Sequence, residues 1–138
     1  MAKVRDIMQK NVITIENLKK ANDAANILKE REISFLVVVK EGKPIGIVSE
    51  RDIVRKIVAD NNDSQTTQLE TIMSKNFKWV EPNASIESAV QKMLNNNIRR
   101  LVVLENENLA GVITQTDLTE FLRSKILINA TVKNIEID

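Results

Sequence analysis

The chain of 138 residues contains no cysteine and no histidine. Without cysteine it has no disulfide, no thiolate nucleophile and no cysteine-ligated metal. Without histidine it lacks the commonest general base and the commonest transition-metal ligand. These two absences exclude Ser-His and Cys-His catalytic machinery and leave carboxylates for acid–base chemistry. Our predictions are no catalytic residues, no metal site and no cofactor, and we expect that the protein is not an enzyme.

Aromatic residues are also scarce, and positive and negative charges nearly balance. Aromatics make up 3% of the chain, and 20 basic against 19 acidic residues leave a net charge of +1. The balanced charge gives no global attraction to nucleic acid or to an anionic membrane, so neither partner is expected. The longest apolar run, Phe35 to Val39, is far too short to span a membrane. Because the N-terminus also lacks an apolar signal core, we expect a cytoplasmic protein.

What the chain does contain is an internal repeat. A glycine, a hydroxyl residue three positions later and an aspartate three positions after that occur twice, and the offset from Gly46 to Gly111 and from Asp52 to Asp117 is 65 residues. A repeat of that length is too long for a helical solenoid and predicts two similar α/β units. The same offset aligns Ile7-Met8 with Ile72-Met73, Ala24 with Ala89, Ile33 with Ile98, and 36–38 with 101–103.

Local patterns predict the same order of elements, β-α-β-β-α, in each copy. In the first copy the expected strands are 12–15, 35–39 and 45–48, and the expected helices are 22–31 and 50–59. In the second copy the expected strands are 77–80, 101–104 and 109–113, and the expected helices are 86–94 and 117–122. Two finer predictions are a turn over 41–44 and Ser85 as an N-cap. For the helix over 50–59, the periodicity places Ile53, Val54, Ile57 and Val58 on the inner face.

The polar segment 61–68 lacks periodicity and is the expected linker between the copies. The predicted domains are accordingly unit 1 over 1–60, the linker over 61–68, unit 2 over 69–123 and a C-terminal extension over 124–138. Two interpretations of the extension remain open at this point, which are a closing strand and a partner-binding segment.

The motif residues, in their order and spacing, give the chain a family likeness. Residues 4–8, 11–15, 33–38 and 46–52 resemble a CBS domain, and the second copy resembles another. The resemblance covers about 4–122 and implies an α/β (α+β) fold in which two CBS units pack with pseudo-two-fold symmetry into one compact pair, a Bateman module. It also implies two clefts between the units that bind adenosyl ligands such as AMP, ADP, ATP, NADH or S-adenosylmethionine. Such pairs commonly form homodimers and regulate an enzyme, channel or transporter; we expect a stand-alone pair that acts on a separate, unidentified protein.

The repeated motif suits a nucleotide for physical reasons. Its glycines lack a Cβ atom and allow close backbone approach. Its hydroxyl residues lie at a helix start, where free N–H groups favour an anion, and its aspartates can accept hydrogen bonds from both ribose hydroxyls. The same spacing is also a helix capping box, and this second interpretation stays open. The candidates are Gly46 and Gly111 for close approach, Ser49 and Thr114 for phosphate, and Asp52 and Asp117 for ribose.

Residues around the motif complete the expected clefts. Arginines suit a multiply charged phosphate, and the resemblance places other side chains on the cleft walls around adenine. Trp79 stands where the first copy has Thr14, and packing in the core is its favoured interpretation, with adenine stacking as the alternative. The phosphate candidates are Arg51, Arg99 and Arg100, the last two being expected to reach the cleft that contains Ser49 and Asp52, and the wall candidates are Thr14, Ser34, Phe35, Ile47, Trp79 and Val112.

Two other functions compete with nucleotide sensing. The first is a protein-interaction or dimerisation module with degenerate, empty clefts, which Trp79 and the apolar tail from Ile126 favour. The second is a carboxylate-dependent hydrolase, which only Asp52, Asp117 and surface acidic residues support. The chain lacks histidine, a glycine-rich phosphate loop and a dense acidic cluster, so the hydrolase is disfavoured.

Overall fold

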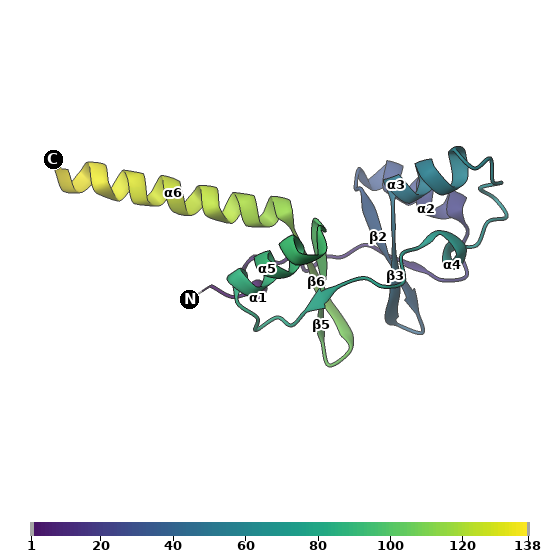
Figure 1. Ribbon diagram of the computed structural model, residues 1–138, viewed down its shortest axis with the longest axis horizontal. Coiled ribbons are helices and arrows are strands. Elements are labelled where there is room, and N and C mark those ends of the chain that lie inside the picture. The colour runs from purple at the N-terminus through teal and green to yellow at the C-terminus, as the bar shows by residue number, and fades with distance from the viewer. Residues whose placement is uncertain (1, 138) are drawn as a thin grey trace. The chain divides into compact units, whose positions relative to one another are not determined.

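The structure, a computed structural model, describes residues 2–137, with side-chain burial described through residue 132. The chain forms two compact units (Figure 1). The first-repeat unit contains Asn11–Lys78 and Asn106–Leu109, and the second-repeat unit contains Met1–Lys10, Trp79–Glu105 and Ala110–Asp138.

The first-repeat unit is built on a three-stranded sheet of order β1-β2-β3. Strand β1 pairs parallel with β2, and β2 pairs antiparallel with β3, with an irregularity between Val38 and Val39. The unit's strands are β1 (Thr14–Glu16), β2 (Phe35–Lys40) and β3 (Lys43–Ser49), and its helical segments are α2 (Ala21–Arg31), α3 (Glu50–Asp52), the π-helix η1 (Ile53–Val58) and α4 (Leu69–Ile72).

The second-repeat unit carries the equivalent sheet of order β4-β5-β6. The parallel register of Trp79 with Val102 repeats that of Thr14 with Val37, 65 residues earlier. Its strands are β4 (Trp79–Val80), β5 (Arg100–Glu105) and β6 (Asn108–Thr114), and its helices are α1 (Val4–Ile7), α5 (Ile86–Asn96) and α6 (Gln115–Ile137).

The hairpins and helix ends follow from local backbone chemistry. Two consecutive residues of positive φ join each hairpin, Glu41 and Gly42 between β2 and β3, and Asn106 and Glu107 between β5 and β6. Positive φ at both central positions is the type I′ pattern, whose twist matches that of the flanking strands. The predicted turn is confirmed at Glu41-Gly42, while Lys43 and Pro44 already belong to β3. Ser85 accepts a hydrogen bond from the Ser88 amide at 3.1 Å and caps α5 as predicted.

Each unit has its own apolar core on one face of its sheet. In β2, Leu36 and Val38 belong to the core that α2 covers, while the alternating Val37 is fully buried but outside that core. Strand alternation explains the division, because successive side chains point to opposite faces. In α2, Ala21, Ala24 and Leu28 are buried at helical spacing, as one packed face requires.

Two predictions about the helices are wrong. Val54 and Val58 are 58% and 68% exposed rather than inward, while Ile57 is buried. Residues 53–58 form a π-helix, whose i→i+5 hydrogen bonds change which side chains share a face. The final helix was expected over 117–122, but α6 begins at Gln115 and ends at Ile137, which excludes the closing strand as an interpretation of the tail. Sequence reasoning also did not find the short helices α1 and α4.

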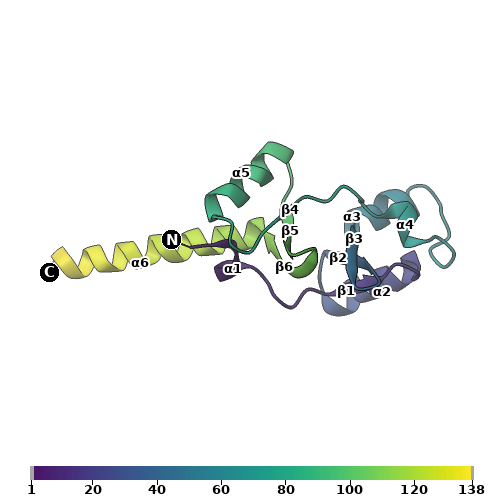
Figure 2. The same cartoon turned by 90° about the horizontal axis from the view of Figure 1, so that it is seen from below.

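The segment before each repeat's first strand packs into the unit of the other repeat. The amide of Val4, a fully buried side chain in the second-repeat core, donates to the Ala84 carbonyl at 2.9 Å. Conversely, Leu69 and Met73 belong to the first-repeat core, and Ser74 pairs with Ile47. Each compact unit therefore contains the segment that precedes the first strand of the other repeat. We call these two segments, 2–10 and 69–78, the exchanged segments. Figure 2 shows α1 beside α6, in agreement with the contacts between these helices.

No helix in the described part of the chain is long and apolar enough to cross a membrane.

Candidate ligand-binding site

In the first-repeat unit the motif forms the junction at which β3 ends and α3 begins. The Ser49 amide donates to Asp52 Oδ2 at 2.9 Å, the Ser49 hydroxyl lies 3.1 Å from the same oxygen, and the Asp52 amide donates to Ser49 Oγ at 3.3 Å. This reciprocal pattern is a capping box, which satisfies donors that the helix start leaves open. The capping interpretation of the motif is confirmed.

The second oxygen of Asp52 faces a cation. Lys56 Nζ lies 3.1 Å from Asp52 Oδ1, and Lys56 also donates to the carbonyl of Ile72 at 2.7 Å. The Asp52 side chain is 13% exposed, so this ion pair is partly shielded from water. Lys56 thus ties the carboxylate of the motif to α4, and sequence reasoning did not single it out, although its i,i+4 spacing from Asp52 was a usable signal.

The second-repeat unit repeats the junction with different outer partners. The Thr114 amide and hydroxyl lie 2.8 and 2.9 Å from Asp117 Oδ2, and the Asp117 amide donates to Thr114 Oγ1 at 3.2 Å. Here the carboxylate receives the side-chain amide of Gln9, whose Nε2 lies 3.1 Å from Oδ1 and 3.3 Å from Oδ2. Nothing in the local sequence indicated Gln9, because it is 108 residues from Asp117.

The motif glycines allow parts of the protein itself to pack closely. A Cβ atom on Gly111 would lie 2.6 Å from the backbone oxygen of Gln9, and one on Gly46 would lie 2.6 Å from Met73 Sδ. Protein atoms therefore occupy the space next to each glycine where a Cβ atom would lie. The glycines allow the exchanged N-terminal segments to pair with β3 and β6, as the Ile47–Ser74 and Gln9–Val112 bridges show.

The residues that open β2 and β5 lie next to the helix starts. The Glu50 amide donates to the Ser34 carbonyl at 2.9 Å, and the Gln115 amide donates to the Arg99 carbonyl at 2.8 Å. Phe35 is paired in register with Ser49. The structure thus brings Ser34 and Phe35 next to the first capping box and the backbone of Arg99 next to the second. In the first-repeat unit, Arg51 follows Ser49 by two positions and is exposed.

The predicted wall residues differ widely in exposure. Ile47 and Val112 are buried, whereas Thr14 is exposed at the start of β1. Trp79 is 43% exposed, so its favoured interpretation as a core residue is wrong. Lys92 Nζ donates to the Trp79 carbonyl at 2.6 Å and lies 5.6 Å from the centroid of the ring. An exposed indole next to an ammonium group offers a flat surface for stacking.

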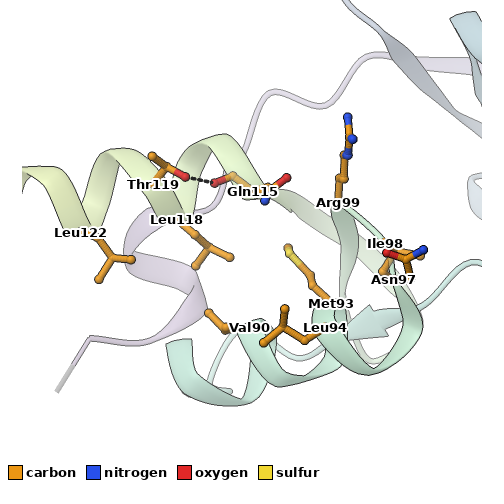
Figure 3. Close-up of a pocket in the computed structure, with 10 residues that line it drawn as sticks. All are labelled: Val90, Met93, Leu94, Asn97, Ile98, Arg99, Gln115, Leu118, Thr119 and Leu122. Carbon is orange, nitrogen blue, oxygen red and sulfur yellow. Dashed lines mark hydrogen bonds between the residues drawn. The ribbon is translucent and has the colours of Figure 1, made fainter.

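A groove that sequence reasoning did not find lies between α5 and α6 of the second-repeat unit (Figure 3). Its volume is about 420 Å³, and Met93, Leu118 and Leu122 supply apolar walls. Arg99 and Gln115, from the capping-box region, lie at one end of the groove. Within the described residues, no group of three or more acidic side chains could hold a metal ion.

Comparison with known proteins places the repeat in a family. The CBS domain family matches residues 4–59 and again 69–124. The CBS domain-containing protein YhcV of Bacillus subtilis is 33% identical over 118 residues, which are 86% of this chain and 84% of that protein.

Solved structures of CBS domain proteins have a similar fold. A putative signal-transduction protein with CBS domains from Burkholderia ambifaria has a TM-score of 0.81 at 30% identity, over 88% of this chain and 93% of that one. The CBS domain pair of protein MJ0100, in complex with 5′-methylthioadenosine and S-adenosyl-L-methionine, has a TM-score of 0.81 at 28% identity, over 91% and 98% of the two chains.

Proposed function

Because the chain belongs to the CBS domain family, which matches it twice, we propose that it is a regulatory module that binds an adenosyl ligand. The ligand class is AMP, ADP, ATP or a related molecule such as S-adenosylmethionine or NADH. Binding occurs at the capping boxes and changes how the module acts on a separate protein. The adenosyl ligands bound to the MJ0100 pair support this class.

The observation that carries the proposal is the carboxylate held at each strand–helix junction. Its Oδ2 atom accepts from the backbone and hydroxyl of the residue three positions earlier, which fixes its orientation. A carboxylate has about four acceptor sites, of which the capping box uses two. A ribose would use the remaining sites, which face Lys56 in one unit and Gln9 in the other. Asp52 and Asp117 are the proposed ribose ligands of the two units.

The phosphate is better assigned to arginines than to the hydroxyl residues. Ser49 and Thr114 are engaged with the carboxylates of their own capping boxes, at 3.1 and 2.9 Å. A phosphate would have to break those contacts before it gained one. Guanidinium groups bind phosphate oxygens through two parallel hydrogen bonds, which makes Arg51, Arg99 and Arg100 the stronger candidates. Adenine is proposed to lie against Thr14, Ser34 and Phe35 at the first-repeat site and against Trp79 at the second-repeat site.

Calorimetric titration with AMP, ADP, ATP, NADH, S-adenosylmethionine and 5′-methylthioadenosine tests the proposal. At least one ligand is expected to bind, and Asp52→Asn and Asp117→Asn are each expected to remove or weaken a site. Asp23→Asn is the matched control, because Asp23 accepts from the Lys20 amide at 2.9 Å in a capping box outside the site. A panel that gives no heat, or a loss that Asp23→Asn reproduces, contradicts the proposal.

Thermal unfolding gives an independent readout. A ligand that binds only the folded chain stabilises it by about 2.7 kcal/mol at a hundredfold excess over its dissociation constant. The melting temperature is therefore expected to rise with the concentration of the ligand that gives heat. An unchanged melting temperature at saturation would contradict specific binding to the folded state.

A second candidate function is a protein-interaction module, which the surface of α6 favours. The helix continues well past the groove-lining Leu122 and exposes further large apolar side chains, namely Ile126, Leu127, Ile128 and Val132. A chain that ends at Arg123 separates the two functions. If nucleotide binding persists while partner capture or self-association is lost, α6 carries the interaction; if neither changes, this second candidate is wrong.

A further inference from the structure

The two capping-box carboxylates are occupied by different side chains. Asp52 faces the ammonium group of Lys56 at 3.1 Å, and Asp117 faces the amide group of Gln9 at 3.1 and 3.3 Å. The repeat does not conserve either partner, because the residue 65 positions after Gln9 is Ser74 and the residue 65 positions after Lys56 is Phe121. The side chain of Ser74 is two atoms shorter than that of Gln9 and ends in a hydroxyl group. Ser74 therefore does not supply an amide equivalent to that of Gln9.

Gln9 is held in place by its backbone. Its amide donates to the Val112 carbonyl at 2.8 Å, and the Val112 amide donates back to the Gln9 carbonyl at 3.0 Å. The missing Cβ of Gly111 makes this pairing possible. Upstream, the fully buried Val4 anchors the same segment in the second-repeat core. The side chain of Gln9 therefore projects from a fixed position next to Asp117.

The geometry of that contact resembles the one a ribose would make. One nitrogen lies within hydrogen-bond distance of both carboxylate oxygens of Asp117. A vicinal diol also addresses both oxygens of a carboxylate, with one hydroxyl to each. Because Oδ2 already accepts from the amide and hydroxyl of Thr114, the remaining acceptor positions are few. The amide of Gln9 and a diol would have to use the same ones.

We infer that Gln9 competes with the ligand's diol for Asp117, which makes it a residue that sets the affinity of the second-repeat site. This inference rests on the proposed function, since it needs an adenosyl ligand at Asp117. Ligand capture displaces the Gln9 side chain while its backbone stays paired with Val112. The first-repeat site has no such competitor from its exchanged segment and differs by having the cation Lys56 beside its aspartate.

Titration of AMP into chains that carry Asp52→Asn tests the inference, because that substitution isolates the second-repeat site. In this background Gln9→Ala and Gln9→Met are expected to bind AMP about 3- to 10-fold more tightly, as loss of one competing hydrogen bond predicts. Gln9→Met keeps the length of the side chain without its donor. Ser74→Ala, at the equivalent position of the other repeat, is the matched control and leaves the affinity unchanged.

A second test uses a nucleotide that lacks the ribose diol. The 2′,3′-dideoxy analogue of AMP is expected to bind the Gln9→Ala chain and its parent equally, because it has no hydroxyl groups to compete with the amide. In nuclear magnetic resonance spectra, the side-chain amide signals of Gln9, assigned by their loss in Gln9→Ala, are expected to shift on addition of AMP and not of the analogue.

The outcomes separate the inference from the function on which it rests. If AMP binds the parent chain and neither Gln9 variant binds more tightly, or if the Gln9 amide signals do not move, the inference is overturned and the proposed function stands. If no chain binds any adenosyl ligand in the panel, the proposed function fails, and the inference fails with it.

Discussion

Substitution of Gly111 by alanine tests the exchanged packing of the N-terminal segment. The new Cβ atom would lie 2.6 Å from the backbone oxygen of Gln9 and 3.0 Å from Met8 Sδ. A backbone oxygen has little freedom to move, so the segment must shift and lose its pairing with Val112. Two backbone hydrogen bonds, of 2.8 and 3.0 Å, join those residues.

The expected cost of Gly111→Ala follows from these contacts. Each of the two hydrogen bonds contributes about 0.5–1.5 kcal/mol net, and forcing a methyl group into a packed site costs about 1–3 kcal/mol. Because the two effects overlap, we expect the free energy of unfolding to fall by about 2–4 kcal/mol. For a chain of this size that lowers the melting temperature by about 6–12 °C.

Urea unfolding monitored by circular dichroism, together with amide hydrogen exchange at Gln9 and Val112, provides the assay. Gly46→Ala is the internal comparison, since its two closest contacts, at 2.6 and 2.9 Å, are with the movable Met73 side chain and the backbone oxygen of Ser74 lies at 3.0 Å; we expect a smaller loss of about 1–2 kcal/mol. The reasoning is refuted if Gly111→Ala changes the free energy by less than about 0.5 kcal/mol and leaves both amides protected.

Three further predictions concern stability. Leu36→Ala removes a fully buried core side chain and is expected to cost about 2–5 kcal/mol in urea unfolding, whereas Val58→Ala, at a 68% exposed position, is expected to stay within about 0.5 kcal/mol of the parent. Ser49→Ala is expected to cost about 1 kcal/mol through loss of the cap; an unchanged melting temperature would contradict the capping geometry. Lys56→Met removes both the ion pair and the 2.7 Å hydrogen bond to the Ile72 carbonyl, and we expect faster amide exchange in α4, which Lys56→Arg should largely avoid.

Much of the fold was predictable because its determinants are local. The continuous apolar run rich in β-branched residues marks β2, the spacing of Ala24 and Leu28 marks α2, and Glu41-Gly42 marks the hairpin turn. The helix over 53–58 shows the limit of such reasoning. Its residues suit an ordinary amphipathic helix, but the π-helical hydrogen bonding that exposes Val54 and Val58 is not encoded in an apolar period of 3.6.

The candidate site divides in the same way. The capping boxes Ser49–Asp52 and Thr114–Asp117 lie within four residues of sequence, and their pattern was sufficient to find them. The core interpretation of Trp79, favoured over adenine stacking, is wrong, because Trp79 on β4 is 43% exposed. The groove between α5 and α6 was missed because it needs the packing of two helices that the sequence separates.

The sequence by itself determined that there are two copies of one β-α-β-β-α unit, and it located the carboxylate at the start of one helix in each. It could do so because strand alternation, helix periodicity and capping are short-range effects. Only the tertiary structure decided that residues 2–10 pack in the unit of the second repeat and that 69–78 pack in that of the first. That exchange brings Gln9 to Asp117, 108 residues away. Contacts between such distant segments depend on how whole elements pack, so the two carboxylates look alike in the sequence and differ in their partners.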